Sequence, residues 1–287
     1  MVMGLERRLT MYKEHYVENA LAKVWNDLQD DYHVLYLAVQ GSTNYNLDVY
    51  SDEYMSDVDM KAFVMPKFED LYFNKRVSKT LMTEFGQVEV KDVRLLPELL
   101  GKMNSSYLEL LYTPYYLMDE NFAERLDRLR ELGPDLVKDR FALLVKSMRG
   151  MVLEKQNAMC HEYEGLKDKL AAFGGYDPKQ LHHAYRLLFM LDGMVNDEKD
   201  FGEVLEFNDS LRDFLLNVKV NGVGDVLTAM DMMDNVVEQV QELYDKVWDN
   251  KTPKSEYLVK STGAMSVAEA VVYMMVRDHF TEVEYNY

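Results

Sequence analysis

The sequence predicts an α+β fold, in which a small domain with a β-sheet at residues 1–118 is followed by an all-helical domain at residues 119–287. Short apolar runs bounded by turn residues, which are typical of strands, lie in the first domain. Beyond about residue 117, long patterns with helical spacing take their place, and no strand-like alternation competes with them. A hydrophobic content of 48% and six prolines indicate a folded chain throughout.

The first domain is expected to begin with an amphipathic helix at about residues 6–28, where apolar side chains recur at near-helical spacing. Three strands follow, of which the first ends at the turn Gly41-Ser42 and the second stops at Pro66. Two helices complete the domain, and Ser105 can cap the second of them. In chain order, these five elements are expected at residues 34–39, 58–64, 83–93, 95–104 and from 105 onward.

The second domain is expected to consist of helices separated by breakers such as Gly174-Gly175 and Asn221-Gly222. The five longest helical patterns lie at residues 135–156, 178–194, 209–218, 225–248 and 266–280. The change from strands to helices places the boundary between the two domains near residue 118.

The charge of the chain is strongly acidic, because 50 acidic residues against 32 basic ones give a net charge of −18. Such a surface excludes broad nucleic-acid binding. It does not exclude a local contact with RNA or the binding of a nucleotide together with its metal ion. The apolar runs are far too short to span a bilayer, so no membrane partner is expected. A single cysteine, Cys160, excludes an intrachain disulfide and is typical of a cytoplasmic protein.

Two aspartates one residue apart, Asp57 and Asp59, form the pattern with the clearest chemistry. Side chains at positions i and i+2 of a strand point the same way, so the two carboxylates converge at one edge of the predicted sheet. Carboxylate oxygens are the ligands that Mg²⁺ prefers. The turn Gly41-Ser42 ends the preceding strand, and its N–H groups and the Ser42 hydroxyl are suited to phosphate oxygens. Taken alone, Asp-x-Asp is common in any acidic protein, and Ser42 can equally cap a helix.

A third carboxylate would complete a two-metal site, and the next predicted strand offers Glu89 or Asp92. Glu89 lies between Val88 and Val90, which suits an inward acid on a mostly buried strand. Asp92, three residues further on, points to the opposite face. We therefore favour Glu89, although a solvated strand residue is an equally good interpretation of it.

The order Gly-Ser, loop, Asp-x-Asp and an acid on a later strand resembles the nucleotidyltransferase fold of the DNA polymerase β superfamily, whose palm domain is a small mixed sheet. Within this superfamily the chain is similar to the predicted nucleotidyltransferases of the YcgL and RlaP type. Three passages, at residues 41–59, 93–111 and 181–188, carry this closer resemblance. The chain departs from the family at Tyr45-Asn46, where the family has Tyr-Gly, and at Asn104-Ser105, where it has Asn-Pro.

The resemblance implies an enzyme that transfers a nucleoside monophosphate from an NTP, such as ATP, to an acceptor hydroxyl. Asp57 and Asp59 would hold Mg²⁺ or Mn²⁺, with Glu89 as a further metal ligand or as the base toward the acceptor. The residues that would bind the nucleotide are Gly41, Ser42, Lys61, Arg94, His182 and Arg186. His182 and Arg186 share one face of a helix in the second domain, but an ordinary core histidine is the alternative interpretation.

Other functions are compatible with the same residues. A catalytically inactive nucleotidyltransferase-fold module that binds nucleotide or protein is the main alternative. A metal-dependent phosphohydrolase is disfavoured, because no His-Asp cluster accompanies the aspartate pair. An RNA 3′ end, a protein hydroxyl and a small molecule all remain candidate acceptors, and the oligomeric state is open.

Overall fold

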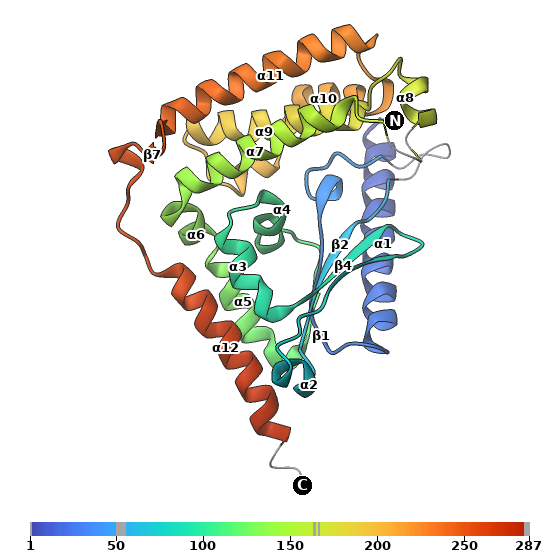
Figure 1. The fold of residues 1–287 in the computed structure, drawn as a ribbon. Coiled ribbons are helices and arrows are strands. Elements are labelled where there is room, and N and C mark those ends of the chain that lie inside the picture. The colour runs from blue at the N-terminus through green and yellow to red at the C-terminus, as the bar shows by residue number, and fades with distance from the viewer. Residues whose placement is uncertain (1, 50–55, 163–164, 166, 284–287) are drawn as a thin grey trace. The chain divides into compact units, whose positions relative to one another are not determined.

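The computed structural model describes residues 2–49, 56–162, 165 and 167–283 (Figure 1). The chain divides into two compact units, which we call the sheet unit and the helical unit. The sheet unit comprises Met1–Lys102, Ser106–Leu136 and Ser261–Tyr287, and the helical unit comprises Met103–Ser105 and Val137–Lys260. A mixed five-stranded sheet together with a helical region confirms the predicted α+β class.

This division differs from the boundary expected at residue 118. Two helices beyond that residue, α5 (Ala123–Glu131) and α12 (Ala264–Val283), belong to the sheet unit. The reason is packing, since α12 contacts both α3 (Leu96–Gly101) and α5. Helical periodicity predicts where a helix forms but not on which surface it packs, so the return of α12 to the sheet unit could not be predicted.

The sheet unit is built around five strands in the order β3-β4-β2-β1-β5. Their bounds are β1 (Val34–Val39), β2 (Met60–Val64), β3 (Ser78–Met82), β4 (Gln87–Asp92) and β5 (Tyr116–Met118). β2 and β4 run parallel, and the other neighbouring strands are antiparallel. The start of β2 and the end of β1 therefore meet at one edge of the sheet.

Two of these strands, β3 and β5, were not predicted. β3 is an edge strand whose residues are almost all exposed, so its sequence lacks the alternation of a half-buried strand. β5 has three residues, too few for a pattern. The strand expected at residues 83–93 corresponds to β4 and the turn before it, and the strand expected at residues 58–64 begins two residues later, at Met60.

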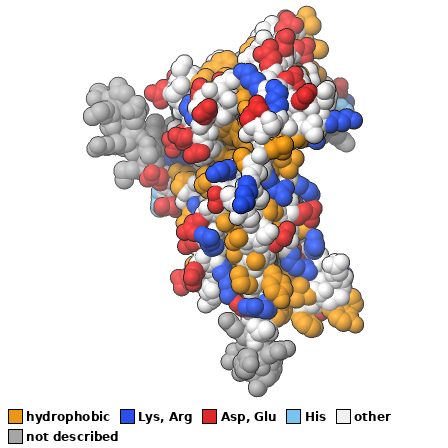
Figure 2. Space-filling model, turned by 90° about the vertical axis from the view of Figure 1, so that its left-hand side faces the viewer, with side chains coloured by type: hydrophobic (Ala, Val, Ile, Leu, Met, Phe, Trp, Pro, Cys, Tyr) orange, Lys and Arg blue, Asp and Glu red, His pale blue; other side chains and the backbone are white. Residues whose placement is uncertain are grey.

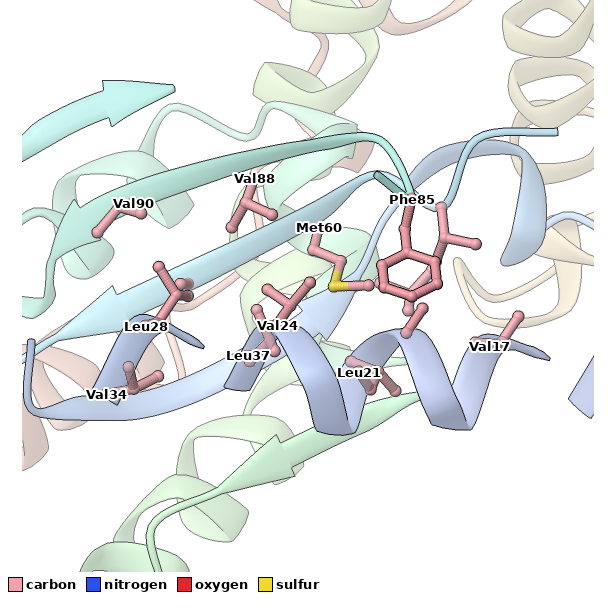
Figure 3. Packing of buried hydrophobic residues seen from close by; sticks show 14 of the residues in the cluster. Val17, Leu21, Val24, Leu28, Val34, Leu37, Met60, Phe85, Val88 and Val90 are labelled. Carbon is pink, nitrogen blue, oxygen red and sulfur yellow. The ribbon is translucent and has the colours of Figure 1, made fainter. Parts of the chain in front are cut away.

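One face of the sheet is covered by α1 (Val2–Gln29), as Figure 3 shows. Val17, Leu21, Val24 and Leu28 are spaced by three or four residues and therefore lie on one side of this helix. The strand residues packed against them include Val34, Leu37, Met60, Val88 and Val90. This buried cluster holds β1, β2 and β4 together beneath the edge that carries the aspartates.

The helical unit centres on α9 (Pro178–Val195), which packs against α7, α10 and α11. The other helices of this unit are α7 (Phe141–Met159), α8 (Lys167–Ala172), α10 (Asp209–Asn221) and α11 (Val226–Val247). Of the remaining helices, α2 (Phe68–Tyr72) belongs to the sheet unit, whereas α4 (Ser105–Leu108) and α6 (Gly133–Asp139) each have residues in both units. The long helices lie where helical periodicity predicted them, except that the single helix expected at residues 135–156 is divided at Arg140 into α6 and α7. Strands were not expected here, but Trp248–Asp249 (β6) and Thr252–Pro253 (β7) form a short hairpin.

No helix in the part of the chain that the structure describes combines the length and the apolar character needed to cross a bilayer. Figure 2 shows one face of the molecule, on which acidic and basic side chains are interspersed. On this face, the acidic side chains are therefore mixed with basic ones and do not form a single acidic patch.

Candidate metal and phosphate site

Asp57 and Asp59 lie just before β2, at the sheet edge where β1 ends. Val58 and Met60 are buried in the core, whereas Asp57 is exposed and Asp59 is half-buried. This alternation places both carboxylates on the face of the sheet opposite α1. The segment is tied to the neighbouring hairpin, because Val58 N–H donates to the carbonyl oxygen of Phe85 at 2.7 Å.

The Asp59 carboxylate is oriented by the turn between β3 and β4. Its Oδ1 accepts a hydrogen bond from Gln87 N–H at 3.0 Å. Gly86, just before Gln87, has a φ of +153°, and a Cβ at this position would lie 3.0 Å from Asp59 Oδ1 and from the Val58 carbonyl oxygen. Glycine is therefore needed for this close approach. The sequence does not indicate the role of Gly86, because its contact with Asp59 depends on how the strands pair.

The predicted phosphate-binding turn opens a short 3₁₀ helix, Gly41–Thr43, at the end of β1. Gly41 has a φ of +80°, a left-handed conformation that favours glycine. Ser42 is half-buried. The residue before the turn, Gln40, donates its N–H to the Asp59 carbonyl oxygen at 2.9 Å. The structure thus brings the turn and the aspartate pair to the same edge of the sheet.

The turn and the loop after it are held by hydrogen bonds to the rest of the sheet unit. The buried Glu109 accepts a hydrogen bond from Gly41 N–H at 3.2 Å, so this amide already has a carboxylate partner. Asn44 Nδ2 donates to the last carbonyl of β1 at 2.8 Å. Lys13, on α1, donates to the buried Asp48 carboxylate at 2.9 Å. These contacts fix residues 41–48 of the loop, and they leave the Ser42 hydroxyl as the predicted phosphate donor.

Lys61 and Glu89 form an ion pair on the same face of the sheet. The parallel register places them opposite each other, with 2.7 Å between Lys61 Nζ and Glu89 Oε1. The Lys61 side chain is 2% exposed, donates to Gln40 Oε1 and lies 4.6 Å from the centre of the Tyr107 ring. Burial raises the pKa of Glu89, but the hydrogen bond and charge of Lys61, with smaller effects of Tyr107 and Lys91, outweigh it and leave this pKa below its ordinary value.

Asp92 and Arg94 lie at the opposite end of the sheet. Asp92 pairs in register with Val64, the last residue of β2, whereas Asp59 comes just before the first. The Asp92 carboxylate is fully buried and accepts hydrogen bonds from Arg94 Nε at 2.9 Å and from a terminal guanidinium nitrogen at 2.6 Å. This placement excludes Asp92 as the third carboxylate beside Asp57 and Asp59, and it does not bring Arg94 to them.

His182 and Arg186, predicted as nucleotide ligands, are buried in the helical unit. His182 is 1% exposed, and its Nδ1 lies 2.9 Å from the carbonyl oxygen of Leu215 on α10. Burial lowers the pKa of His182 to about 3, opposed by the bond to Leu215 and assisted by the positive charge of Arg186. This environment favours the interpretation of His182 as a core histidine that is neutral at physiological pH.

The buried His182 is expected to make the helical unit sensitive to acid. The unfolded chain takes up a proton near pH 6.5, whereas folded His182 stays neutral down to about pH 3. Stability is therefore full above pH 6.5 and falls below it, with a loss of about 2 kcal/mol from this group by pH 5. Urea unfolding at pH 7 and pH 5 should show a smaller loss in His182→Gln than in the wild type. The exposed His161→Gln is the control, and an equal pH dependence in all three proteins would contradict the assignment.

Among the residues that the structure describes, no three His, Cys, Asp or Glu side chains are grouped so that they could hold a metal ion. Asp57, Asp59 and Glu89 are all described, so Glu89 does not join the aspartates as a third ligand in this conformation. A cavity of about 460 Å³ lies at the far end of the sheet, lined by Tyr32, His33 and other residues, and contains none of the predicted site residues. At the sheet edge where β1 ends, Asp57 and Asp59 are therefore the two carboxylates that are candidates for holding a metal ion.

No protein-family model and no curated protein match this chain. Among solved structures, a nucleotidyltransferase-like protein from Exiguobacterium sibiricum 255-15 is similar at 10% sequence identity, and the alignment covers 91% of this chain and 74% of that one. The TM-score of this alignment is 0.27, which is too low to indicate a shared topology. The candidate function therefore rests on the residues described above.

Proposed function

We propose that the sheet unit is the catalytic unit of a metal-dependent nucleotidyltransferase. The observation that carries this proposal is the hydrogen bond from Gln40 N–H to the Asp59 carbonyl oxygen, which ties the Gly41-Ser42 turn to the aspartate pair. A phosphate-binding turn and a carboxylate pair at one sheet edge are the two parts that a metal–triphosphate complex needs.

The two aspartates fit a magnesium ion in their chemistry. Mg²⁺ is usually bound through one or two carboxylates plus substrate phosphates, and it keeps several waters. One oxygen of the Asp59 carboxylate accepts a hydrogen bond from Gln87 N–H, which orients the carboxylate, while Asp57 is exposed. Metal ligands are commonly held in place by such a hydrogen bond from a neighbouring group.

In the proposed reaction, an acceptor hydroxyl attacks the α-phosphate of an NTP. A new P–O bond forms to the acceptor oxygen, the bond to pyrophosphate breaks, and the hydroxyl proton passes to solvent. When bound, the metal would supply Lewis-acid stabilisation of the phosphoryl oxygens. Asp57 and Asp59 would hold that ion, and Ser42 would donate its hydroxyl to a phosphate oxygen. We place Glu89 outside the proton transfer, because Lys61 and Tyr107 already engage its carboxylate.

The main alternative is a nucleotide-binding module that has lost catalysis. Two contacts favour it: Glu89 is paired with Lys61, and the Gly41 amide is bonded to Glu109. In either case the ligand would be a nucleoside triphosphate with Mg²⁺ or Mn²⁺. RNA 3′ ends, protein hydroxyls and small molecules are the candidate acceptors, and we propose cytoplasm as the location.

The proposal is tested by incubating the purified protein with each labelled NTP, Mg²⁺ or Mn²⁺, and a pool of RNA and proteins. We expect metal-dependent release of pyrophosphate and transfer of label to one class of acceptor, which identifies both substrates. Tight NTP binding without release of pyrophosphate would instead support the binding module. If no NTP binds in the presence of either metal, both functions are wrong.

A further inference from the structure

A buried ammonium group lies on the same face of the sheet as the aspartate pair. Lys61 follows Asp59 by two residues, so strand alternation places Asp57, Asp59 and Lys61 in one row. Its side chain is 2% exposed. A cation in the same row as the two carboxylates that are proposed to hold the metal is relevant to how many metal ions the site needs.

Glu89, the acid expected to complete a two-metal site, is already saturated. Its Oε1 lies 2.7 Å from Lys61 Nζ, and its Oε2 accepts from the Tyr107 hydroxyl at 3.1 Å. Lys91 Nζ lies 3.7 Å from the same Oε2. Each oxygen of Glu89 thus faces a proton donor, whereas a metal ligand must direct its lone pairs at the ion.

The strand register explains why Glu89 meets a lysine rather than the aspartates. Asp59 contacts Gln87, and Glu89 lies two residues further along β4, opposite Lys61. Two residues of a strand span roughly 7 Å. Glu89 therefore lies beside Lys61, two residues further along the strand direction than Asp59.

Resting on the proposed function, we propose that this site takes a single divalent cation, held by Asp57 and Asp59, and that Lys61 stands in for the second. Glu89 is then a positioning residue, the counterion that holds the ammonium in the row. Lys61 also donates to Gln40, the residue before the Gly41-Ser42 turn, so the same ammonium supports the phosphate-binding turn. Recruiting Glu89 to a second metal would leave a buried ammonium without its anion, which is strongly unfavourable.

The number of Mn²⁺ ions bound per chain tests this proposal, measured by electron paramagnetic resonance with a non-hydrolysable ATP analogue. We expect one Mn²⁺ in the wild type. Glu89→Gln should keep the stoichiometry at one Mn²⁺ per chain, like the exposed control Glu98→Gln, whereas Asp59→Asn should lower the Mn²⁺ affinity by at least about tenfold. In Lys61→Met, Oε1 of Glu89 loses its lysine partner and should recruit a second Mn²⁺.

The outcomes separate this inference from the proposed function. Two Mn²⁺ per wild-type chain, with one lost in Glu89→Gln, would overturn the single-cation site and leave the proposed function standing. Wild-type stoichiometry decides this point even if Glu89→Gln does not fold. A failure of Lys61→Met to gain Mn²⁺ would overturn the role of Lys61 as a substitute cation. Mn²⁺ binding that Asp59→Asn does not change would overturn the proposed function as well.

Discussion

Replacing Glu89 by leucine is expected to lower the free energy of unfolding by about 3–5 kcal/mol, because it leaves the buried Lys61 ammonium without its anion. Gln40 and the Tyr107 ring still contact the ammonium, but neither carries a negative charge. Replacing both members of the pair by apolar residues of similar volume removes the uncompensated charge. The double variant Lys61→Met/Glu89→Leu should therefore recover most of the loss.

Urea unfolding of the single and double variants measures this coupling. Glu98→Leu is the matched control, because Glu98 is exposed and its ion pair with Lys102 lies on the surface of α3. Its effect should stay within about 1 kcal/mol. If Glu89→Leu is no more destabilising than Glu98→Leu, or if the double variant is simply additive, Lys61 does not depend on Glu89.

The second large effect is expected at the aspartate pair. Asp57→Asn with Asp59→Asn should reduce nucleotidyl transfer by at least about a thousandfold, because several kcal/mol of metal-derived stabilisation are lost and each 1.36 kcal/mol is a factor of ten. Stability should change little, since the side-chain amide oxygen that Asp59→Asn introduces can still accept from Gln87 N–H. Pyrophosphate release and urea unfolding measure the two quantities on the same preparation.

An exposed aspartate provides the control for this experiment. Asp30→Asn removes one aspartate charge just beyond the end of α1, near the opposite end of the sheet, and should leave the rate of transfer unchanged. A double variant at Asp57 and Asp59 that retains the wild-type rate would place the chemistry elsewhere in the molecule. A large loss of stability in that variant would instead assign the two carboxylates to structure.

Much of the fold could be predicted because its signals are local. The strand Val34–Val39 is a continuous apolar run, and the spacing of apolar residues in α1 selects one helix face. β3 and β5 escaped prediction because one is an exposed edge and the other is very short. The expected boundary at residue 118 also differed from the observed division, since the packing of α12 is a long-range property.

In the candidate site, too, local features could be predicted and long-range contacts could not. The i, i+2 spacing and the turn at Gly41 bring Asp57, Asp59 and Ser42 to one edge of the sheet, because they flank two consecutive strands that pair with each other. The pairing of Lys61 with Glu89 depends on the register of β2 against β4, which the sequence does not specify. Likewise, periodicity placed His182 on a helix face but did not reveal that α10 covers it.

The way in which α12 rejoins the sheet unit also affects how the protein is made. The helical unit lies within the sequence of the sheet unit rather than after it. During synthesis, residues 137–260 emerge from the ribosome before α12, so the helical unit has all its residues while the sheet unit still lacks a helix. Until α12 arrives, the surfaces of α3 and α5 that it covers are bare. The sheet unit, which is translated first, is therefore the last to be completed. A chain that ends prematurely after residue 260 would carry a complete helical unit attached to an incomplete sheet unit.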